Sequence, residues 1–197
     1  MVERKEYLDQ LWAWKDERQI KVVTGIRRCG KSVLLEQYQQ RLLANGVTPE
    51  QIISINFENL DYEPLKDYMK LYNYLKERLC ADKMTYIFLD EVQEVPSFEK
   101  VVDSLYIRDY VDVYITGSNA YMLSSGRYTE IKMLPLSFRE YMAVTGMAKE
   151  EAFAEFMKTG GIPYVAVMNR TDEKIDQYLE GIYNTVIVKD IEQRQAR

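Results

Sequence analysis

Short apolar runs alternate along the chain with longer segments of helical periodicity. The runs predict strands at residues 20–24, 52–57, 85–89 and 111–116, and an edge strand at 131–134. Segments between them repeat leucine, valine and tyrosine every three or four positions, which predicts helices at 3–16, 31–45, 64–79 and from 96 through 105. Such alternation predicts an α/β fold in which helices cover a parallel sheet of five strands.

The last third of the chain has a different pattern. After Pro135, helical periodicity predicts helices at 138–144 and 151–158 and another from Asp172 onward, while glycines and a proline at 160–163 interrupt the pattern. The chain has no internal repeat and no low-complexity linker. These features give no hard domain boundary before Leu136, but we expect an α/β core over residues 1–135 and a helical, lid-like segment over 136–197.

The first strand leads directly into the sequence GIRRCGKS, which fits the phosphate-loop pattern G-x-x-x-x-G-K-[ST]. Backbone N–H groups of such a loop, together with the positive end of the following helix, surround a phosphate. Lys31 is expected to reach the β- and γ-phosphates, and the Ser32 hydroxyl to ligate Mg²⁺. The predicted nucleotide-binding residues are Gly25, Ile26, Arg27, Arg28, Cys29, Gly30, Lys31, Ser32 and Val33.

Asp90 and Glu91 directly follow the apolar strand predicted at 85–89. The Asp90 carboxylate is expected at the carboxyl edge of the sheet, where it can hold Mg²⁺ through water. Glu91 is placed to polarise an attacking water. An isolated Asp-Glu pair is more often the start of a polar loop, but its position after a phosphate loop favours the catalytic interpretation.

Two further residues extend the predicted site. Asn119 follows the fourth strand and is expected to contact the γ-phosphate or the water, with Thr116 and Ser118 as alternatives; a turn asparagine without this role is the simpler reading. Arg127 could neutralise charge in the transition state, in its own chain or in a neighbouring subunit. The simpler reading of Arg127 is a solvated surface arginine.

Composition limits the possible functions. Histidine is absent, which excludes histidine-based triads and metal sites, and a net charge of −5 gives no overall electrostatic argument for nucleic-acid binding. No apolar run is long enough for a membrane helix, and the charged N-terminus lacks a signal-peptide pattern. We therefore expect a cytoplasmic protein with no membrane partner and with reduced cysteines.

The motifs GIRRCGKS, YIFLDEVQ, YITGSN, SSGRYTEIKMLPLSFREY and GGIPY occur in this order. Together they resemble the prokaryotic AAA-type ATPases of the STAND-like branch of P-loop NTPases, whose core is a three-layer α/β sandwich. The resemblance implies a Walker A motif at 25–32, a Walker B motif at Asp90 with Glu91, a sensor at Asn119 and a finger-like arginine at Arg127. It also implies that Gly161 and Pro163 approach the adenine.

The leading functional hypothesis is an ATPase that binds ATP or ADP with Mg²⁺ and converts hydrolysis into conformational change. The alternative is a nucleotide-gated switch that hydrolyses negligibly. A P-loop kinase is a weaker possibility, and the lack of an NKxD-like segment disfavours GTP. Family members generally continue into a further C-terminal domain, so we expect a truncated chain. Its macromolecular partner is not predicted, and a homo-oligomer would follow if Arg127 acted in trans.

Overall fold

The computed structural model describes residues 2–117, 126–168 and 171–195, with side chains described up to residue 184. It divides into two compact units. The first comprises residues 1, 3–26 and 30–133. The second comprises residues 2, 27–29 and 134–197, so that the tip of the phosphate loop is grouped with the C-terminal helices.

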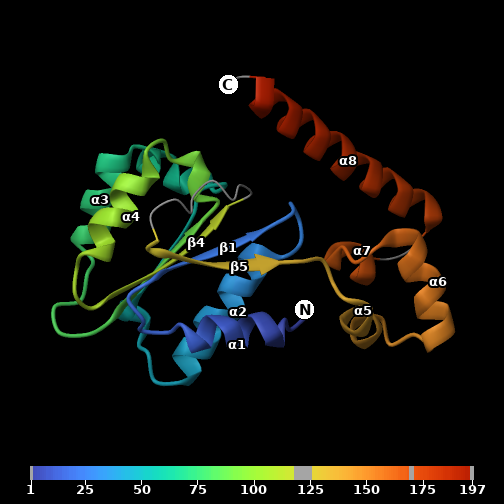
Figure 1. Cartoon of the computed structure of the whole chain (residues 1–197), viewed down its shortest axis with the longest axis horizontal. Coiled ribbons are helices and arrows are strands. Elements are labelled where there is room, and N and C mark those ends of the chain that lie inside the picture. Colours follow the sequence, from blue (N-terminus) through green and yellow to red (C-terminus); the bar gives the residue numbers. More distant parts are fainter. Residues whose placement is uncertain (1, 118–125, 169–170, 196–197) are drawn as a thin grey trace. The chain divides into compact units, whose positions relative to one another are not determined.

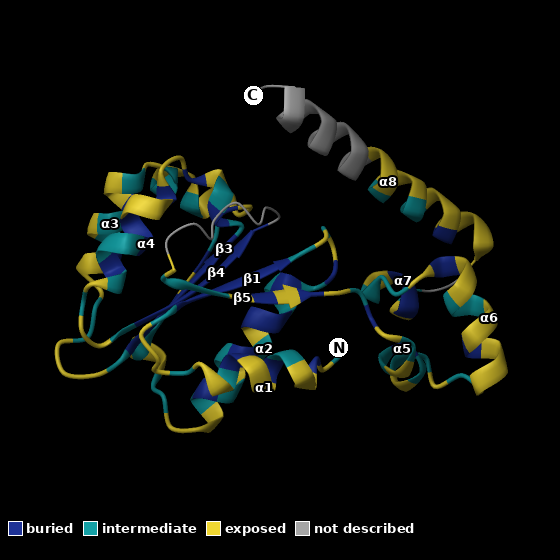
Figure 2. Cartoon of the chain, viewed as in Figure 1, coloured by how far each residue is buried: buried dark blue, intermediate teal, exposed yellow. Residues whose placement is uncertain are grey.

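The first unit is built on a parallel sheet of five strands in the order β2-β3-β4-β1-β5 (Figure 1). The strands are β1 Ile20–Gly25, β2 Ile52–Asn56, β3 Thr85–Asp90, β4 Val111–Gly117 and β5 Tyr128–Met133. The prediction of a five-stranded parallel sheet with an edge strand at its end is confirmed. β3 and most of β4 are buried, as apolar runs in a parallel sheet require (Figure 2).

Helices cover both faces of this sheet. They are α1 Lys5–Ala13 and α2 Lys31–Ala44 on one face, and α3 Tyr68–Lys76 and α4 Phe98–Tyr106 on the other (Figure 1). Successive residues of β3 point to opposite faces of the sheet. Ile87 and Leu89 join the core under α3 and α4. Phe88 points to the other face, where its ring stacks on that of Tyr114 with centroids 4.9 Å apart and lies next to Tyr38 of α2. The α/β fold thus has three layers.

The segment before α3 differs from the expected helix. Residues Leu60–Lys66 form a 3-10 helix that contains Pro64, and α3 begins only at Tyr68. The cause is Asp67, whose carboxylate accepts hydrogen bonds from the N–H groups of Met69 at 3.0 Å and Lys70 at 2.9 Å. A side-chain acceptor at this position fixes the start of a helix. Two further 3-10 helices span Pro49–Gln51 and Val92–Glu94.

A buried polar network links β1 and β4 near their amino ends. The Lys21 ammonium lies 2.5 Å from Asp112, and both side chains are almost completely buried. Asp112 also accepts hydrogen bonds from the Asp16 N–H at 3.0 Å and the Tyr114 hydroxyl at 2.8 Å. Desolvation lowers the pKa of Lys21 and raises the pKa of Asp112. Through the Asp16 N–H, the network holds the segment between α1 and β1 against the sheet, at the amino ends of the strands.

The second unit contains helices α5 Phe138–Thr145, α6 Lys149–Thr159, α7 Pro163–Val167 and α8 Asp172–Gln195. Its core is formed by Leu136, Tyr141, Ala152 and Ala166. Gly161 packs against the backbone of Leu136: a Cβ atom at position 161 would lie 2.2 Å from the Leu136 carbonyl oxygen, so only glycine fits. In the described part of the chain, every helix is too short or too polar to cross a membrane.

Candidate functional site

The site is built where four parallel strands end at the same edge of the sheet. β1 continues into the phosphate loop, and the last residues of β2 and β3, Asn56 and Asp90, are paired in register. Thr116, near the end of β4, is paired with Val23 of β1. Parallel strands bring such carboxyl-end residues together regardless of their distance in sequence.

The phosphate loop ends in the left-handed conformation that its second glycine allows. Gly30 has φ +100° and occupies the N-cap of α2, where it offers no side-chain oxygen to the N–H groups of the first helical turn. Those groups are therefore left for an anion. Ser32 and Val33, in the same turn, are half-buried.

The tip of the loop carries side chains with contrasting environments. Ile26 is exposed, and Cys29 is completely buried. Arg28 has φ +65°, and its guanidinium lies over the ring of Tyr178 in α8, 5.1 Å from the ring centroid. Within the second unit, Arg28 is thus held by an aromatic ring. Arg27 is half-buried.

Lys31 and Glu91, which are far apart in sequence, meet at the centre of the site. The Lys31 ammonium is 3.6 Å from Oε1 of Glu91 and 3.3 Å from the carbonyl oxygen of Gly25. Lys31 is 4% exposed and Glu91 18%, so the pair faces the loop with little solvent around the ammonium. A phosphate arriving in the loop would compete with Glu91 for Lys31.

Asp90 is held by its neighbours on both sides. The Thr116 hydroxyl donates to Oδ1 of Asp90, and the Asn56 amide donates to Oδ2 at 3.0 Å. Asp90 is buried, and these two bonds fix the plane of its carboxylate. Thr116, which with Ser118 was an alternative to Asn119 in the sequence prediction, thus connects the Asp90 carboxylate to β4.

Glu91 adopts a strained backbone conformation, with φ 53° and ψ 47°. A residue with a side chain rarely occupies this region unless the surroundings hold it there. Its N–H donates to the Thr116 hydroxyl oxygen at 2.8 Å, and its Oε2 accepts a hydrogen bond from the Gln93 amide. The turn therefore aims the Glu91 carboxylate back toward Lys31.

The oxygen donors at this edge suit Mg²⁺. Ser32 supplies a hydroxyl and Asp90 a carboxylate, the hard ligands that Mg²⁺ prefers alongside water and nucleotide phosphates. No cluster of three or more metal-ligating side chains occurs within residues 2–117, 126–168 and 171–184. A metal ion held by few protein groups and by phosphate oxygens fits such an arrangement.

Arg127 does not lie near Lys31 within the first unit. Its carbonyl oxygen accepts a hydrogen bond from the N–H of Ile20, which places Arg127 at the amino end of β5, at the edge opposite the loop. Its guanidinium is 3.2 Å from Asp103 and lies over the ring of Tyr106. The cis arrangement therefore has no support in this geometry, and only the trans arrangement stays a prediction.

The structure does not place two other predicted residues, Asn119 and Pro163, beside Lys31 and Asp90. Asn119 lies outside the described residues. Pro163 is the first residue of α7 in the second unit. Two residues earlier, the Gly161 carbonyl oxygen accepts a hydrogen bond from the Leu136 N–H at 2.6 Å. Gly161 packs against Leu136, and its approach to an adenine stays a prediction.

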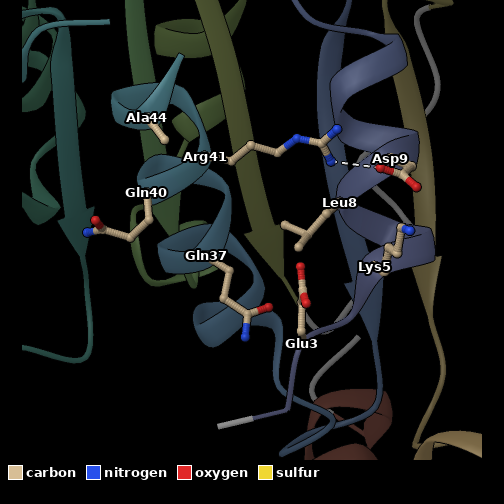
Figure 3. Close-up of a pocket in the computed structure, with 8 residues that line it drawn as sticks. All are labelled: Glu3, Lys5, Leu8, Asp9, Gln37, Gln40, Arg41 and Ala44. Carbon is tan, nitrogen blue, oxygen red and sulfur yellow. Dashed lines mark hydrogen bonds and ion pairs between the residues drawn. The ribbon is translucent and has the colours of Figure 1, made fainter. Parts of the chain in front are cut away.

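A groove of about 550 Å³ lies elsewhere in the first unit, between α1 and α2 (Figure 3). It is lined by Glu3, Lys5, Leu8, Asp9, Gln37, Gln40, Arg41 and Ala44. The Arg41 guanidinium crosses it to reach Asp9 at 2.8 Å (Figure 3). None of the predicted site residues lines this groove.

Most of the chain matches a known protein family. Residues 17–142 match a family model described as an AAA domain. The chain belongs to the AAA domain family. This AAA domain is 36% identical over 208 aligned residues to an uncharacterized protein of Haemophilus influenzae, an alignment that covers 98% of the chain and 51% of the relative. The chain thus spans about half the length of that relative.

The AAA domain also resembles solved structures. A Walker-type ATPase of Pyrococcus abyssi superposes with a TM-score of 0.59 at 16% identity, over 100% of this chain and 76% of that one. At this identity the likeness shows the fold alone, which is that of a P-loop NTPase. PCH-2 of C. elegans matches at a TM-score of 0.48 and 16% identity, over 79% of this chain and 44% of that one. This TM-score is too low to support an argument.

Sequence reasoning missed two residues of the AAA domain site. Asn56 and Gln93 hold the oxygens of Asp90 and Glu91. A polar residue at the carboxyl end of a predicted strand was a usable signal for Asn56, since its place matches that of Asp90. Gln93 gave no such signal, because its role depends on the turn that Glu91 makes.

Proposed function

We propose that this AAA domain binds Mg-ATP and hydrolyses it to ADP and phosphate, using the energy for a conformational change. The observation that carries the proposal is the pairing of Lys31 with Glu91 at 3.6 Å, beside the fixed carboxylate of Asp90. Lys31 would move to the β- and γ-phosphates, which frees one oxygen of Glu91. A phosphate-binding cation and a base carboxylate are what hydrolysis requires.

In the proposed reaction, Glu91 accepts a proton from water as the water oxygen bonds to the γ-phosphorus. The bond from the γ-phosphorus to the bridging oxygen breaks, and ADP leaves with its electron pair. When bound, Mg²⁺ neutralises phosphate charge. Ser32 and Asp90 would hold the metal, Asp90 through water.

The remaining predicted residues are part of this proposal. Asn119 would contact the γ-phosphate or the water, Pro163 the adenine, and Arg127 the nucleotide of a neighbouring subunit. Residues 136–197 would act as a lid, which is supported by the contact between the loop residue Arg28 and Tyr178 of α8. The macromolecule on which this domain acts is not assigned.

The second candidate is a switch that binds nucleotide and hydrolyses negligibly. It would hold if the pair of Glu91 and Lys31 persisted with nucleotide bound, because the lysine would then keep Oε1 of Glu91 from meeting the water. Phosphate release at saturating Mg-ATP separates the two functions. Multiple turnover supports the ATPase, whereas tight binding without phosphate release supports the switch.

A further inference from the structure

Gln93 lies two residues beyond the base carboxylate, in the short helix Val92–Glu94. Its amide nitrogen donates a hydrogen bond to Oε2 of Glu91. The other oxygen of Glu91, Oε1, is the one 3.6 Å from the Lys31 ammonium. The two carboxylate oxygens thus have different partners, one from the turn and one from the phosphate loop.

The orientation of the Gln93 amide follows from these contacts. Reversing the amide would place Oε1 of Gln93 against a carboxylate oxygen of Glu91, which is repulsive, so the nitrogen must face Glu91. The amide oxygen is then buried, without a hydrogen-bond partner among the described residues. Leaving a buried acceptor unpaired costs stability. Core packing therefore gives no reason for a glutamine here, whereas its bond to Glu91 does.

The turn that carries Gln93 is rigidly placed. Val92 and Val95 on either side are buried in the core under α3 and α4. Backbone hydrogen bonds from the Glu94 N–H to the Glu91 carbonyl at 3.1 Å and from the Val95 N–H to the Val92 carbonyl at 3.0 Å close the turn. The backbone at Gln93 is thus held at a fixed place relative to the Glu91 backbone, and the bond to Oε2 of Glu91 orients the amide.

We propose that Gln93 is a positioning residue for ATP hydrolysis, one that anchors Oε2 of Glu91 so that Oε1 alone faces the phosphate loop. This inference rests on the proposed function. When Lys31 turns to the nucleotide phosphates, Oε1 loses its partner and becomes the proton acceptor, while Gln93 keeps the carboxylate from rotating. Without Gln93 the carboxylate would sample orientations that do not meet the water.

Gln93→Met tests the proposal, because methionine has a similar length and removes both the donor and the unpaired acceptor. We expect kcat for Mg-ATP to fall about 10- to 100-fold, the range for losing a hydrogen bond to a charged group, with an unchanged KM. The melting temperature should be unchanged or higher. Gln39→Met is the matched control, since Gln39 donates to the Ser54 hydroxyl at 3.1 Å and has no contact with Glu91 among the described residues. This control should keep parental activity.

A double-mutant cycle with Glu91→Gln shows whether Gln93 acts through Glu91. In the Glu91→Gln background, adding Gln93→Met should slow the residual reaction less than twofold. An equal loss in both backgrounds would overturn the inference, as would parental kcat in Gln93→Met or a loss confined to KM or to the melting temperature. A parent chain that binds Mg-ATP without releasing phosphate would overturn the proposed function and this inference together; a parent that hydrolyses normally isolates the role of Gln93.

Discussion

Thr116 connects the two acidic residues of the site through a single hydroxyl group. The hydroxyl donates to Asp90 and accepts the N–H of Glu91 at 2.8 Å, and Thr116 is fully buried. The left-handed backbone conformation of Glu91 costs roughly 1 to 3 kcal/mol, and the hydrogen bond from its N–H to Thr116 helps to hold it. Thr116, which was only an alternative to Asn119 in the sequence prediction, therefore holds Asp90 and Glu91 in place.

Thr116→Val tests this role, since valine keeps the shape and removes the hydroxyl. The partly buried N–H of Glu91 would lose its acceptor, so we expect the free energy of unfolding to fall by about 1 to 3 kcal/mol and phosphate release to slow. Chemical denaturation and a turnover assay measure the two effects. Thr116→Ser keeps the hydroxyl and should retain most of both; equal behaviour of Val and Ser would contradict the role.

At the scale of elements, the strands and the loop were predictable because their signals are local. Four apolar runs and an edge strand expected at 131–134 predicted the sheet, although β5 begins earlier, at Tyr128. The glycine spacing of GIRRCGKS predicted the loop and the start of α2. The start of α3 was not predicted: a proline is favourable in a first helical turn, but Pro64 lies in a 3-10 helix and the Asp67 carboxylate sets the boundary. The partners of Asp90 and Glu91 depend on register and on a turn, which periodicity does not reveal.

The Lys21–Asp112 pair gives an element-scale prediction about β1 and β4. Either Lys21→Met or Asp112→Asn leaves one buried charge without its partner, which should lower the free energy of unfolding by about 3 to 5 kcal/mol. The double variant carries no buried charge and should lose less than either single variant. Urea denaturation of all four proteins measures the coupling. Additive losses would show that the two charges contribute independently.

At the scale of the whole molecule, the position of Arg127 makes assembly testable. Because Arg127 lies at the edge opposite the loop, catalysis by it requires a second chain. We expect Arg127→Ala to lower kcat with little change in ATP affinity, and specific activity to rise with protein concentration. Mixing Arg127→Ala with Glu91→Gln should restore some turnover, since each chain then supplies what the other lacks.

Arg127 also has a structural explanation that requires no second chain. Arg127 already pairs with Asp103 at 3.2 Å and is 43% exposed, as an ordinary surface arginine can be. Rates that do not depend on protein concentration, with no recovery in the mixture, would assign Arg127 to this surface pair alone.

Lys31 is proposed to bind the nucleotide and Glu91 to activate water, and these two roles can be separated in one paired measurement. Nucleotide binding and phosphate release are measured in parallel on the parent, Lys31→Ala and Glu91→Gln. We expect Lys31→Ala to lose ATP binding, and Glu91→Gln to keep it while hydrolysing about 10² to 10⁴ times more slowly. Parental ATP binding by Lys31→Ala, or parental turnover by Glu91→Gln, would contradict the account.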